Sequence, residues 1–457
     1  MDTIAAIATG SAPTAIGVIR VSGPETDAVV SRVFRPKCAK PFSALEPRRL
    51  FLGALTDRMG RTLDSGMAVR FPAPASYTGE DCAELHCHGS PAAMGEILSA
   101  LFAAGARQAR PGEFTRRAFL NGKLELTQAE AVIDLIDAQT PAAARNAAAQ
   151  LDGALARTVG QVYDELTALA SQFYAVVDYP DEDIEDLDRA KLEDTLRRAD
   201  GTLTRLLDTC GRGRVLRQGV PTAIVGLPNA GKSSLLNALA GYDRAIVTSV
   251  PGTTRDTVEE SVLCGGVLLR LTDTAGIRET DDAVERLGVE RSRSAAQRAE
   301  LVLAVADGSA PLAPENEAVF ALAARCPRWV LVWSKADLAA EPQPAKSWTP
   351  PSAPAAEVAV SSVTGEGLDR LEDAVRALFP AGEAPAGQIL TNARQSEAVS
   401  RARDAVRRAL ETLECGMTPD VILTDAEEAM NALGELTGRT AREDIVSDIF
   451  SRFCVGK

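Results

Sequence analysis

Residues 226–233 read Gly-Leu-Pro-Asn-Ala-Gly-Lys-Ser, and this octapeptide constrains the fold more than any other feature of the chain. It follows the apolar run PTAIV and precedes the helical pattern SLLNALAG. A GxxxxGK[ST] sequence between a strand and a helix is typical of a loop whose backbone N–H groups surround a phosphate. The helix N-terminus adds partial positive charge. The sequence therefore predicts a phosphate-binding α/β domain.

The residues in and after this loop have separate predicted tasks. Lys232 is expected to reach the β- and γ-phosphates of a nucleoside triphosphate, and the Ser233 hydroxyl to ligate Mg²⁺. Thr254, in the motif TTRD, supplies a second hydroxyl ligand while the γ-phosphate is present. Asp273 opens the motif DTAG after the apolar run VLLRL, and would hold Mg²⁺ directly or through a water molecule. The N–H of Gly276 would then lie near the γ-phosphate.

A fourth motif concerns the base. The apolar run WVLVWS ends at Lys335-Ala336-Asp337. A carboxylate at Asp337 accepts both N–H donors of guanine, whereas adenine would leave it desolvated and unpaired, which disfavours ATP. Four motifs in this order predict a GTP hydrolase. Its predicted nucleotide contacts are Asn229, Ala230, Gly231, Lys232, Ser233, Ser234, Thr248, Ser249, Val250, Pro251, Gly252, Thr253, Thr254, Asp273, Thr274, Ala275, Gly276, Ser334, Lys335, Asp337, Ser361, Ser362 and Val363.

The catalytic set differs from the commonest one. Many GTPases place a water-orienting Gln directly after DTAG, but this chain has Ile277 there. Glu285 is the candidate for that role, and on residue type alone a solvated helix charge is an equal alternative. Asn229, helped by a bound monovalent cation, is the candidate for the positive charge that hydrolysis needs. The predicted catalytic residues are thus Glu285, Asn229 and Lys232.

The regions that flank this unit differ from it in the pattern of their apolar residues. Strand-like runs at 15–21, 66–71 and 82–88 and a helical run at 91–106 indicate an α+β domain. Further along, apolar residues recur at helical spacing on both sides of the strand–helix alternation. The predicted fold is multidomain, with an α/β P-loop domain inserted into an all-α domain behind the α+β domain. The predicted boundaries are 1–122 for the α+β domain, 123–217 and 381–457 for the two helical halves, and 218–380 for the inserted domain.

Composition narrows the function classes. The chain has 457 residues, 46% hydrophobic and 25% charged, with a net charge of −14. No apolar run approaches the ~20 residues that span a bilayer, the N-terminus lacks an export signal, and the eight cysteines have no framework spacing. We predict a cytoplasmic location and no membrane association.

A zinc site at Cys82, His86, Cys87 and His88 is disfavoured, since strand side chains alternate faces.

Several motifs resemble one known family. GLPNAGKSSLLNALAG, IVTSVPGTTRD, DTAGIRET and VERLGVERS are similar to the tRNA modification GTPase MnmE (TrmE) family. The similarity extends to SYTGEDCAELHCHGSP, RPGEFTRRAFLNGKLELTQAEAV and the terminal SRFCVGK. It covers nearly the whole chain and is consistent with the inserted-domain layout.

The resemblance implies a cofactor and partner set. Such proteins act with an FAD-dependent partner, MnmG, in a heterotetramer that adds a carboxymethylaminomethyl or aminomethyl group at C5 of the tRNA wobble uridine. A one-carbon tetrahydrofolate, 5-formyl- or methylene-tetrahydrofolate, supplies the carbon. The resemblance also implies a homodimer and a K⁺-dependent GTPase activated when two GTPase domains meet. Potassium would be surrounded by Asn229, Thr248, Thr253 and the backbone carbonyl of Val250.

The resemblance also assigns individual residues. Arg20, Glu84, Lys123 and Lys457 would contact the folate, and Glu285 matches the catalytic glutamate of the family. Cys454 is either a reactive thiol near the one-carbon unit or a small buried residue. One position departs from the pattern: the family commonly has Asn-Lys-x-Asp where this chain has Ser334-Lys335-Ala336-Asp337. Since serine is the shorter side chain, we expect it to miss the usual contact to the base or the phosphate loop.

Two rival functions share a GTPase unit. A ribosome-assembly GTPase would append a small basic RNA-binding module, whereas this chain carries acidic and helical segments. A dynamin-like membrane switch would need a basic or amphipathic lipid-binding stretch, which the sequence lacks. Folate binding by residues 1–120 would separate the first interpretation from both rivals.

Overall fold

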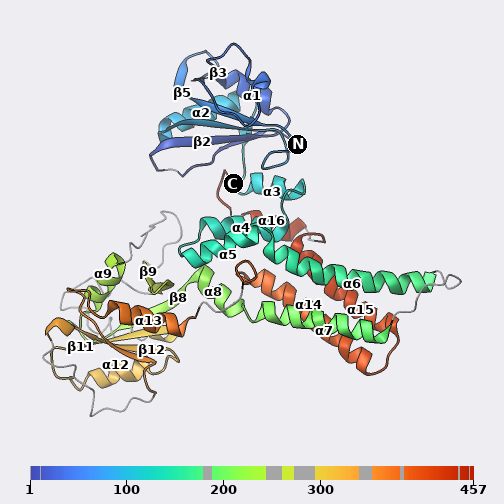
Figure 1. Cartoon of the computed structure of the whole chain (residues 1–457). Coiled ribbons are helices and arrows are strands. Elements are labelled where there is room, and N and C mark those ends of the chain that lie inside the picture. Colours follow the sequence, from blue (N-terminus) through green and yellow to red (C-terminus); the bar gives the residue numbers. More distant parts are fainter. Residues whose placement is uncertain are drawn as a thin grey trace. The chain divides into compact units, whose positions relative to one another are not determined.

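The computed structural model describes residues 2–10, 12–178, 188–242, 260–271, 294–338, 352–380, 385–440, 443–451 and 453–456 (Figure 1). Two compact units are present. The first comprises Met1–Ile133, Gln150–Arg197 and Asp404–Lys457, and the second comprises Asp134–Ala149 and Arg198–Arg403.

The N-terminal part of the first unit is an α+β fold. Its elements are β1 (Ile4–Ile7), β2 (Thr14–Ser22), α1 (Thr26–Val33), β3 (Phe34–Pro36), the 3₁₀ turn η1 (Phe42–Ala44), β4 (Phe51–Thr56), β5 (Thr62–Phe71), β6 (Cys82–Gly89), α2 (Pro91–Ala103), β7 (Arg107–Gln108) and α3 (Glu113–Leu120). Among the described residues the strands form one sheet in the order β3-β4-β5-β6-β2-β1-β7. Of the strand pairs that the structure describes in this sheet, only β1–β7 is parallel. The predicted α+β fold is therefore confirmed.

The two faces of this sheet have different roles. Ala83, Leu85 and Cys87 of β6 are buried in the core beneath α1 and α2 (Figure 1). Because strand side chains alternate faces, Glu84 and His86 of the same strand project from the other face. Helix α2 begins where Ser90 accepts a hydrogen bond from the Ala93 N–H, directly after a strand of mixed polar and apolar residues. The sheet thus keeps one face for its core and leaves polar groups on the other.

Helices precede and follow, along the chain, the residues of the α/β sheet of the second unit. Their bounds are α4 (Leu126–Ile136), α5 (Pro141–Leu151), α6 (Ala154–Asp178), α7 (Arg189–Leu207), α8 (Cys210–Gln218), α14 (Ala393–Glu414), α15 (Pro419–Thr437) and α16 (Glu443–Ser451). In the first unit α6 packs along α15, where Tyr174 donates a 2.6 Å hydrogen bond to Glu427. Phe450 and Phe453 pack with Leu126 and Ala129 of α4. No described helix is long and apolar enough to cross a membrane.

The second unit contains an α/β sheet. Its elements are β8 (Val220–Val225), α9 (Lys232–Tyr242), β9 (Glu260–Cys264), β10 (Val267–Leu271), β11 (Leu301–Asp307), α12 (Asn316–Ala323), β12 (Trp329–Ser334), the 3₁₀ turn η2 (Ala336–Leu338), β13 (Ala356–Ala359) and α13 (Leu368–Leu378). Its described strands run in the order β13-β12-β11-β8-β10-β9, and β9 alone among them is antiparallel to its neighbour.

Apolar side chains cover both faces of this sheet. Leu235 and Leu239 of α9 and Leu371 of α13 belong to the core on one face, and Phe320 of α12 belongs to the core on the other. Strands buried on both faces are nearly continuous apolar runs, which explains the sequence LVLAVAD of β11. Because helices follow strands in this way, loops gather at the carboxyl ends of β8, β11 and β12. The predicted inserted α/β domain is confirmed.

Candidate nucleotide and folate sites

The phosphate loop joins the central strand β8 to helix α9, as predicted. Gly226 packs so closely on β11 that a Cβ there would lie 2.4 Å from the Val305 carbonyl oxygen. Asn229 and Gly231 adopt left-handed backbone conformations, with φ of 60° and 91°. Gly226 and Gly231 let the phosphate loop turn tightly beside β11. The N–H groups of the loop therefore directly precede the N-terminus of α9.

Lys232 is the first residue of α9, and its side chain folds back over the loop. Its Nζ donates hydrogen bonds of 3.0 Å to the Gly226 carbonyl and 2.8 Å to the Leu227 carbonyl. Burial lowers the pKa of Lys232 below its ordinary value. An anionic phosphate beside this amine would restore its preference for the charged form, which suits Lys232 for phosphate binding.

Ser334 ends β12 and contacts the phosphate loop. The side chain is 3% exposed. Its Oγ lies 2.5 Å from the Ala230 carbonyl oxygen and 3.1 Å from the Ala306 carbonyl oxygen of β11. The expectation that serine is too short to reach the phosphate loop is therefore wrong. Strand β11 pairs with β12 at Ser334 and with β8, and Gly226 of the phosphate loop packs on β11, so a short side chain at residue 334 can reach the loop.

Lys335 follows in a left-handed conformation, with φ of 57°. Its Nζ lies 2.5 Å from Oδ2 of Asp307, the last residue of β11. Burial alone would raise the pKa of Asp307, but hydrogen bonds from Lys335 and Ser309 outweigh it and lower this pKa. Asp307 thus remains a carboxylate that fixes the direction of Lys335.

The carboxylate predicted to read guanine lies in the next turn. Asp337 belongs to η2 and is exposed. The Ala336 N–H bonds to the Val360 carbonyl at 3.2 Å, which ties this turn to the loop after β13. In that loop Ser361 is buried, and its Oγ accepts from the N–H groups of Val363 and Thr364. The structure therefore brings together the phosphate loop, residues 334–337 and residues 361–363.

Other predicted residues lie outside the described ranges. They are Glu285, Thr248, Ser249, Val250, Pro251, Gly252, Thr253, Thr254, Asp273, Thr274, Ala275, Gly276 and Lys457. Among the predicted magnesium ligands the structure places Ser233 alone, and among the predicted potassium ligands Asn229 alone. Within the described ranges, no group of three or more His, Cys, Asp or Glu side chains is arranged to hold a metal ion.

On the open face of the N-terminal sheet, Arg20 and Glu84 form an ion pair. They are register partners on β2 and β6. Arg20 Nε and Nη2 lie 3.0 and 2.9 Å from Glu84 Oε1. The Arg20 guanidinium also lies over two aromatic rings, 5.2 Å from the centroid of Tyr77 and 5.8 Å from that of Phe114. His86 Nε2 is 3.6 Å from Glu84 Oε2. Two of the predicted folate residues are thus in direct contact.

Lys123 lies in a segment that is tied to the loop before β6. The Tyr77 hydroxyl is 2.9 Å from Thr115 Oγ1, and Asn121 donates a 2.7 Å bond to the Thr78 carbonyl. Gly79 sits so close that a Cβ would lie 3.3 Å from Lys123 Cγ. Lys123 is therefore placed beside Gly79, in the loop that carries Tyr77.

Sequence reasoning missed a buried ionic network beneath this loop. Arg117, 5% exposed, bonds to Glu80, Glu113 and Asp2. Arg107 pairs with the same Glu113 and Asp2. Burial opposes ionisation of Glu113, but the bonds from Arg107, Arg110 N–H and Arg117 outweigh it and lower its pKa to about 2. The charged residues in RPGEFTRRAF and GEDCAEL were visible in the sequence, but their convergence was not.

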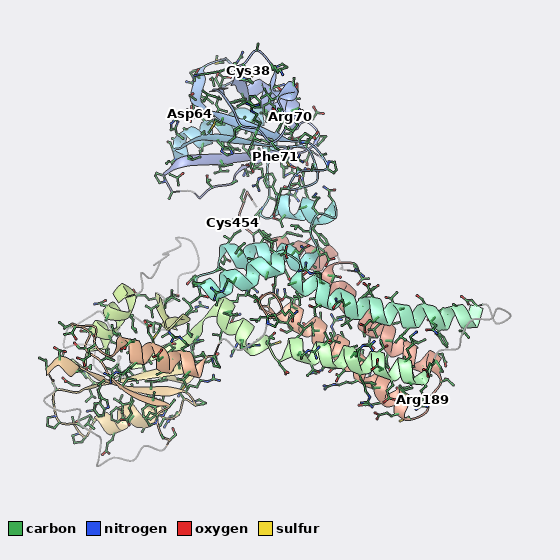
Figure 2. The ribbon with its side chains drawn as sticks, in the orientation of Figure 1. Cys38, Asp64, Arg70, Phe71, Arg189 and Cys454 are labelled. Carbon is green, nitrogen blue, oxygen red and sulfur yellow. The ribbon has the colours of Figure 1, made fainter. Side chains whose placement is uncertain are left out.

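The C-terminal segment reaches the same part of the first unit. Val455 forms an isolated bridge with Pro111, and the Gly112 N–H bonds to the Cys454 carbonyl at 3.4 Å. Gly456 packs so tightly that a Cβ would lie 2.2 Å from the Ile7 carbonyl oxygen. Cys454 itself is exposed (Figure 2), so its description as a small buried residue is wrong. Backbone contacts, rather than the thiol, hold this segment.

A phosphate loop after the central strand, with the Ser-Lys-x-Asp and Ser361–Val363 loops beside it, defines a P-loop GTPase. Comparison with known proteins agrees. A family model described as "MnmE helical domain" matches residues 126–454, and one described as "GTP-binding protein TrmE N-terminus" matches residues 3–123. The chain belongs to the family of the tRNA modification GTPase MnmE.

Curated proteins named tRNA modification GTPase MnmE are similar to the chain over its full length. Those from Heliobacterium modesticaldum and Symbiobacterium thermophilum are 42% and 43% identical, and each alignment covers 100% of this chain and 99% of the relative. The protein from Roseiflexus sp. is 44% identical with the same coverage. The similarity therefore includes both regions that flank the GTPase motifs.

Proposed function

We propose that this GTPase modifies C5 of the wobble uridine in tRNA, adding a carboxymethylaminomethyl or aminomethyl group together with an FAD-dependent partner of the MnmG type. A one-carbon tetrahydrofolate, 5-formyl- or methylene-tetrahydrofolate, is the proposed source of the carbon. We further propose that the protein is a cytoplasmic homodimer and forms a heterotetramer with this partner. The observation that carries the proposal is the Arg20–Glu84 pair, whose guanidinium lies over Tyr77 and Phe114, in a chain with a complete GTPase motif set.

The chemistry of the open sheet face suits a folate. A pterin ring is flat, aromatic and rich in N–H donors, and Glu84 keeps Oε2 on the side away from the Arg20 contact. Tyr77, which is partly exposed, supplies apolar surface for such a ring. Lys123 and Lys457 would neutralise the carboxylates of the folate tail. When bound, the folate supplies a one-carbon unit, while these residues hold and orient it.

In the GTPase domain, each predicted residue has one proposed role. Lys232 pairs with the β- and γ-phosphates, and Asp337 accepts the N–H donors of guanine. Ser233, Thr254 and Asp273 are suited to Mg²⁺, which prefers oxygen ligands. Glu285 orients the attacking water.

Potassium is proposed to bind beside the phosphate loop. Its ligands would be Asn229, Thr248, Val250 and Thr253, when two GTPase domains meet face to face. Asn229 lies within the phosphate loop in a left-handed backbone conformation, with φ of 60°, which supports a place for it beside the phosphates.

Folate binding by the full-length chain tests the proposal. Titration calorimetry with 5-formyltetrahydrofolate should give a saturable isotherm. Arg20→Met or Glu84→Gln should weaken binding by about 10- to 100-fold, the loss expected for a hydrogen bond to a charged group. Arg49→Ala is the matched control, because Arg49 is an exposed arginine of the same domain whose ion pair with Glu46 is also exposed.

A second measurement separates the tRNA function from a ribosome-assembly role. In cells that lack the native gene, the wild-type chain should restore the C5 modification of wobble uridine, measured by mass spectrometry of digested tRNA. Cys454→Ser in the same cells tests the proposed reactive thiol, and full modification by this variant would exclude that role. GTP hydrolysis without folate binding or tRNA modification would favour the ribosome-assembly alternative.

A further inference from the structure

Ser334 occupies a position where related GTPases commonly have asparagine, and its hydroxyl oxygen contacts two backbone carbonyl groups. The side chain is 3% exposed. Its Oγ contacts the carbonyl oxygens of Ala230 and Ala306 at 2.5 and 3.1 Å. A Cβ on Gly231 would lie 3.1 Å from the same Oγ. Ser334 is therefore packed between the phosphate loop and β11.

The hydrogen-bond chemistry of this position is restrictive. A serine hydroxyl carries one proton, whereas an asparagine amide carries two N–H donors. Both neighbours of Ser334 Oγ are carbonyl oxygens, which only accept, so the single proton is committed to them. The N7 and O6 atoms of guanine are also acceptors. An asparagine at this position has one N–H for the phosphate loop and a second for the base. The single hydroxyl proton of serine is used by the backbone carbonyls, so serine has no donor left for the base.

The neighbouring donors are also engaged. The Lys335 ammonium is paired with Asp307 at 2.5 Å. The Ala336 N–H bonds to the Val360 carbonyl, and the Ser361 N–H bonds to the Glu366 carbonyl. The Asp337 carboxylate is exposed, and it is the group proposed to accept the N–H donors of the six-membered ring. Within residues 334–337, recognition of the base is therefore limited to the edge of the purine that carries the N–H donors of the six-membered ring.

We infer that Ser334 makes this GTPase insensitive to the N7 atom of guanine: its hydroxyl ties the base-recognition loop to the phosphate loop and donates nothing to the base. Ser334 is thus a specificity-determining residue. Nucleotides that carry a C–H at position 7 bind as well as natural ones. The inference rests on the proposed role of Asp337 in binding the guanine base.

The test compares GDP with 7-deaza-GDP, in which N7 is replaced by C–H, by titration calorimetry on the full-length chain with Mg²⁺. The wild-type Kd values should agree within about twofold, because no hydrogen bond is lost. Ser334→Asn should favour GDP over 7-deaza-GDP by about three- to tenfold, the range expected for one neutral hydrogen bond. Ser334→Ala loses the tether and should weaken binding of both nucleotides equally.

The outcomes distinguish failure of the inference about N7 from failure of the proposed guanine site. A wild-type preference for GDP above about fivefold that disappears in Ser334→Ala would overturn the inference, even if Ser334→Asn fails to fold. Asp337→Asn should lose GDP affinity whether or not N7 is read, so it reports on the base site alone. If the wild-type chain binds neither nucleotide, the guanine site and the inference both fail.

Discussion

Arg117 Nη1 donates a 2.9 Å hydrogen bond to Oε2 of Glu80, joining helix α3 to the loop before β6. The Ser22 hydroxyl of β2 donates to the same carboxylate oxygen at 2.9 Å. Glu80 therefore links a strand, a loop and a helix of the N-terminal domain. The loop that Glu80 anchors carries Tyr77, whose ring lies against the Arg20 guanidinium. The hydrogen bonds of Glu80 therefore stabilise a loop that borders the proposed folate site.

Removal of Arg117 should destabilise the N-terminal domain strongly. Arg117→Ala leaves Glu80 and Glu113 as buried, underpaired carboxylates, and breaking a buried ion pair from one side costs about 3–5 kcal/mol. We expect a lower midpoint for the first transition in scanning calorimetry. Arg49→Ala, which removes an exposed arginine, should leave that midpoint nearly unchanged. Equal effects of the two substitutions would contradict a structural role for the network.

The same network predicts how stability depends on pH. The pKa of Glu113 falls from 4.5 to about 2 in the folded chain. A depressed pKa stabilises the fold above the unfolded value, and this contribution is lost as the pH falls from 4.5 towards 2. Thermal midpoints measured across this window should fall steeply for the wild type. Glu113→Gln should flatten the curve, and an unchanged slope would argue against the assignment.

Asp337→Asn should change the choice of base. An amide in place of the carboxylate can donate to the C2 oxygen of xanthine, so affinity should shift from GDP to XDP. Loss of the matched hydrogen bonds should weaken GDP binding by roughly 10²-fold or more. Competition between fluorescent GDP and XDP measures the exchange. Retained selectivity for GDP would rule out Asp337 as the base-reading residue.

Glu285→Ala should separate binding from hydrolysis. If Glu285 orients the attacking water, its removal lowers the hydrolysis rate by about 10²–10⁴-fold, the usual contribution of a positioned acid–base group. The Kd for a non-hydrolysable GTP analogue should stay unchanged. Single-turnover phosphate release provides the rate. A variant that hydrolyses GTP normally would restore the alternative of a solvated helix charge.

Replacing K⁺ by Na⁺ tests the proposed cation site beside Asn229. If the smaller Na⁺ does not occupy the site, the transition state loses a stabilising positive charge, and turnover should slow by roughly 10²-fold. Steady-state hydrolysis at constant ionic strength, with Rb⁺ as a size-matched control for K⁺, is the appropriate assay. Equal rates in both salts would eliminate potassium from the mechanism.

The sequence was most informative where chemistry and local geometry coincide. The phosphate loop combines a glycine pattern with an apolar strand and a helix, and the structure confirms all three parts. The expected strands at 15–21, 66–71 and 82–88 lie within β2, β5 and β6. The expected helix at 91–106 is α2, shorter at its C-terminal end. Local signals of this kind need no knowledge of the tertiary fold.

Contacts between distant segments could not be predicted from the residues alone. The Arg20–Glu84 pair depends on the register of β2 against β6, and the family resemblance rather than the pattern pointed to it. The Arg117 network joins residues up to 115 positions apart. The reach of Ser334 to Ala230 depends on the order β12-β11-β8 in the sheet, which places the phosphate loop near the end of β12. Side-chain length alone suggested the opposite.

The close approach of Gly456 to the Ile7 carbonyl has a consequence for biosynthesis. A chain emerging from the ribosome can form β1 early, because N-terminal domains generally fold first during synthesis. The segment that packs against Ile7 and Pro111 follows the second unit in the chain, so it is synthesised long after β1. The N-terminal domain therefore completes this edge only after the whole second unit has been synthesised, and loss of residues 454–456 would leave that edge bare however well the rest has folded.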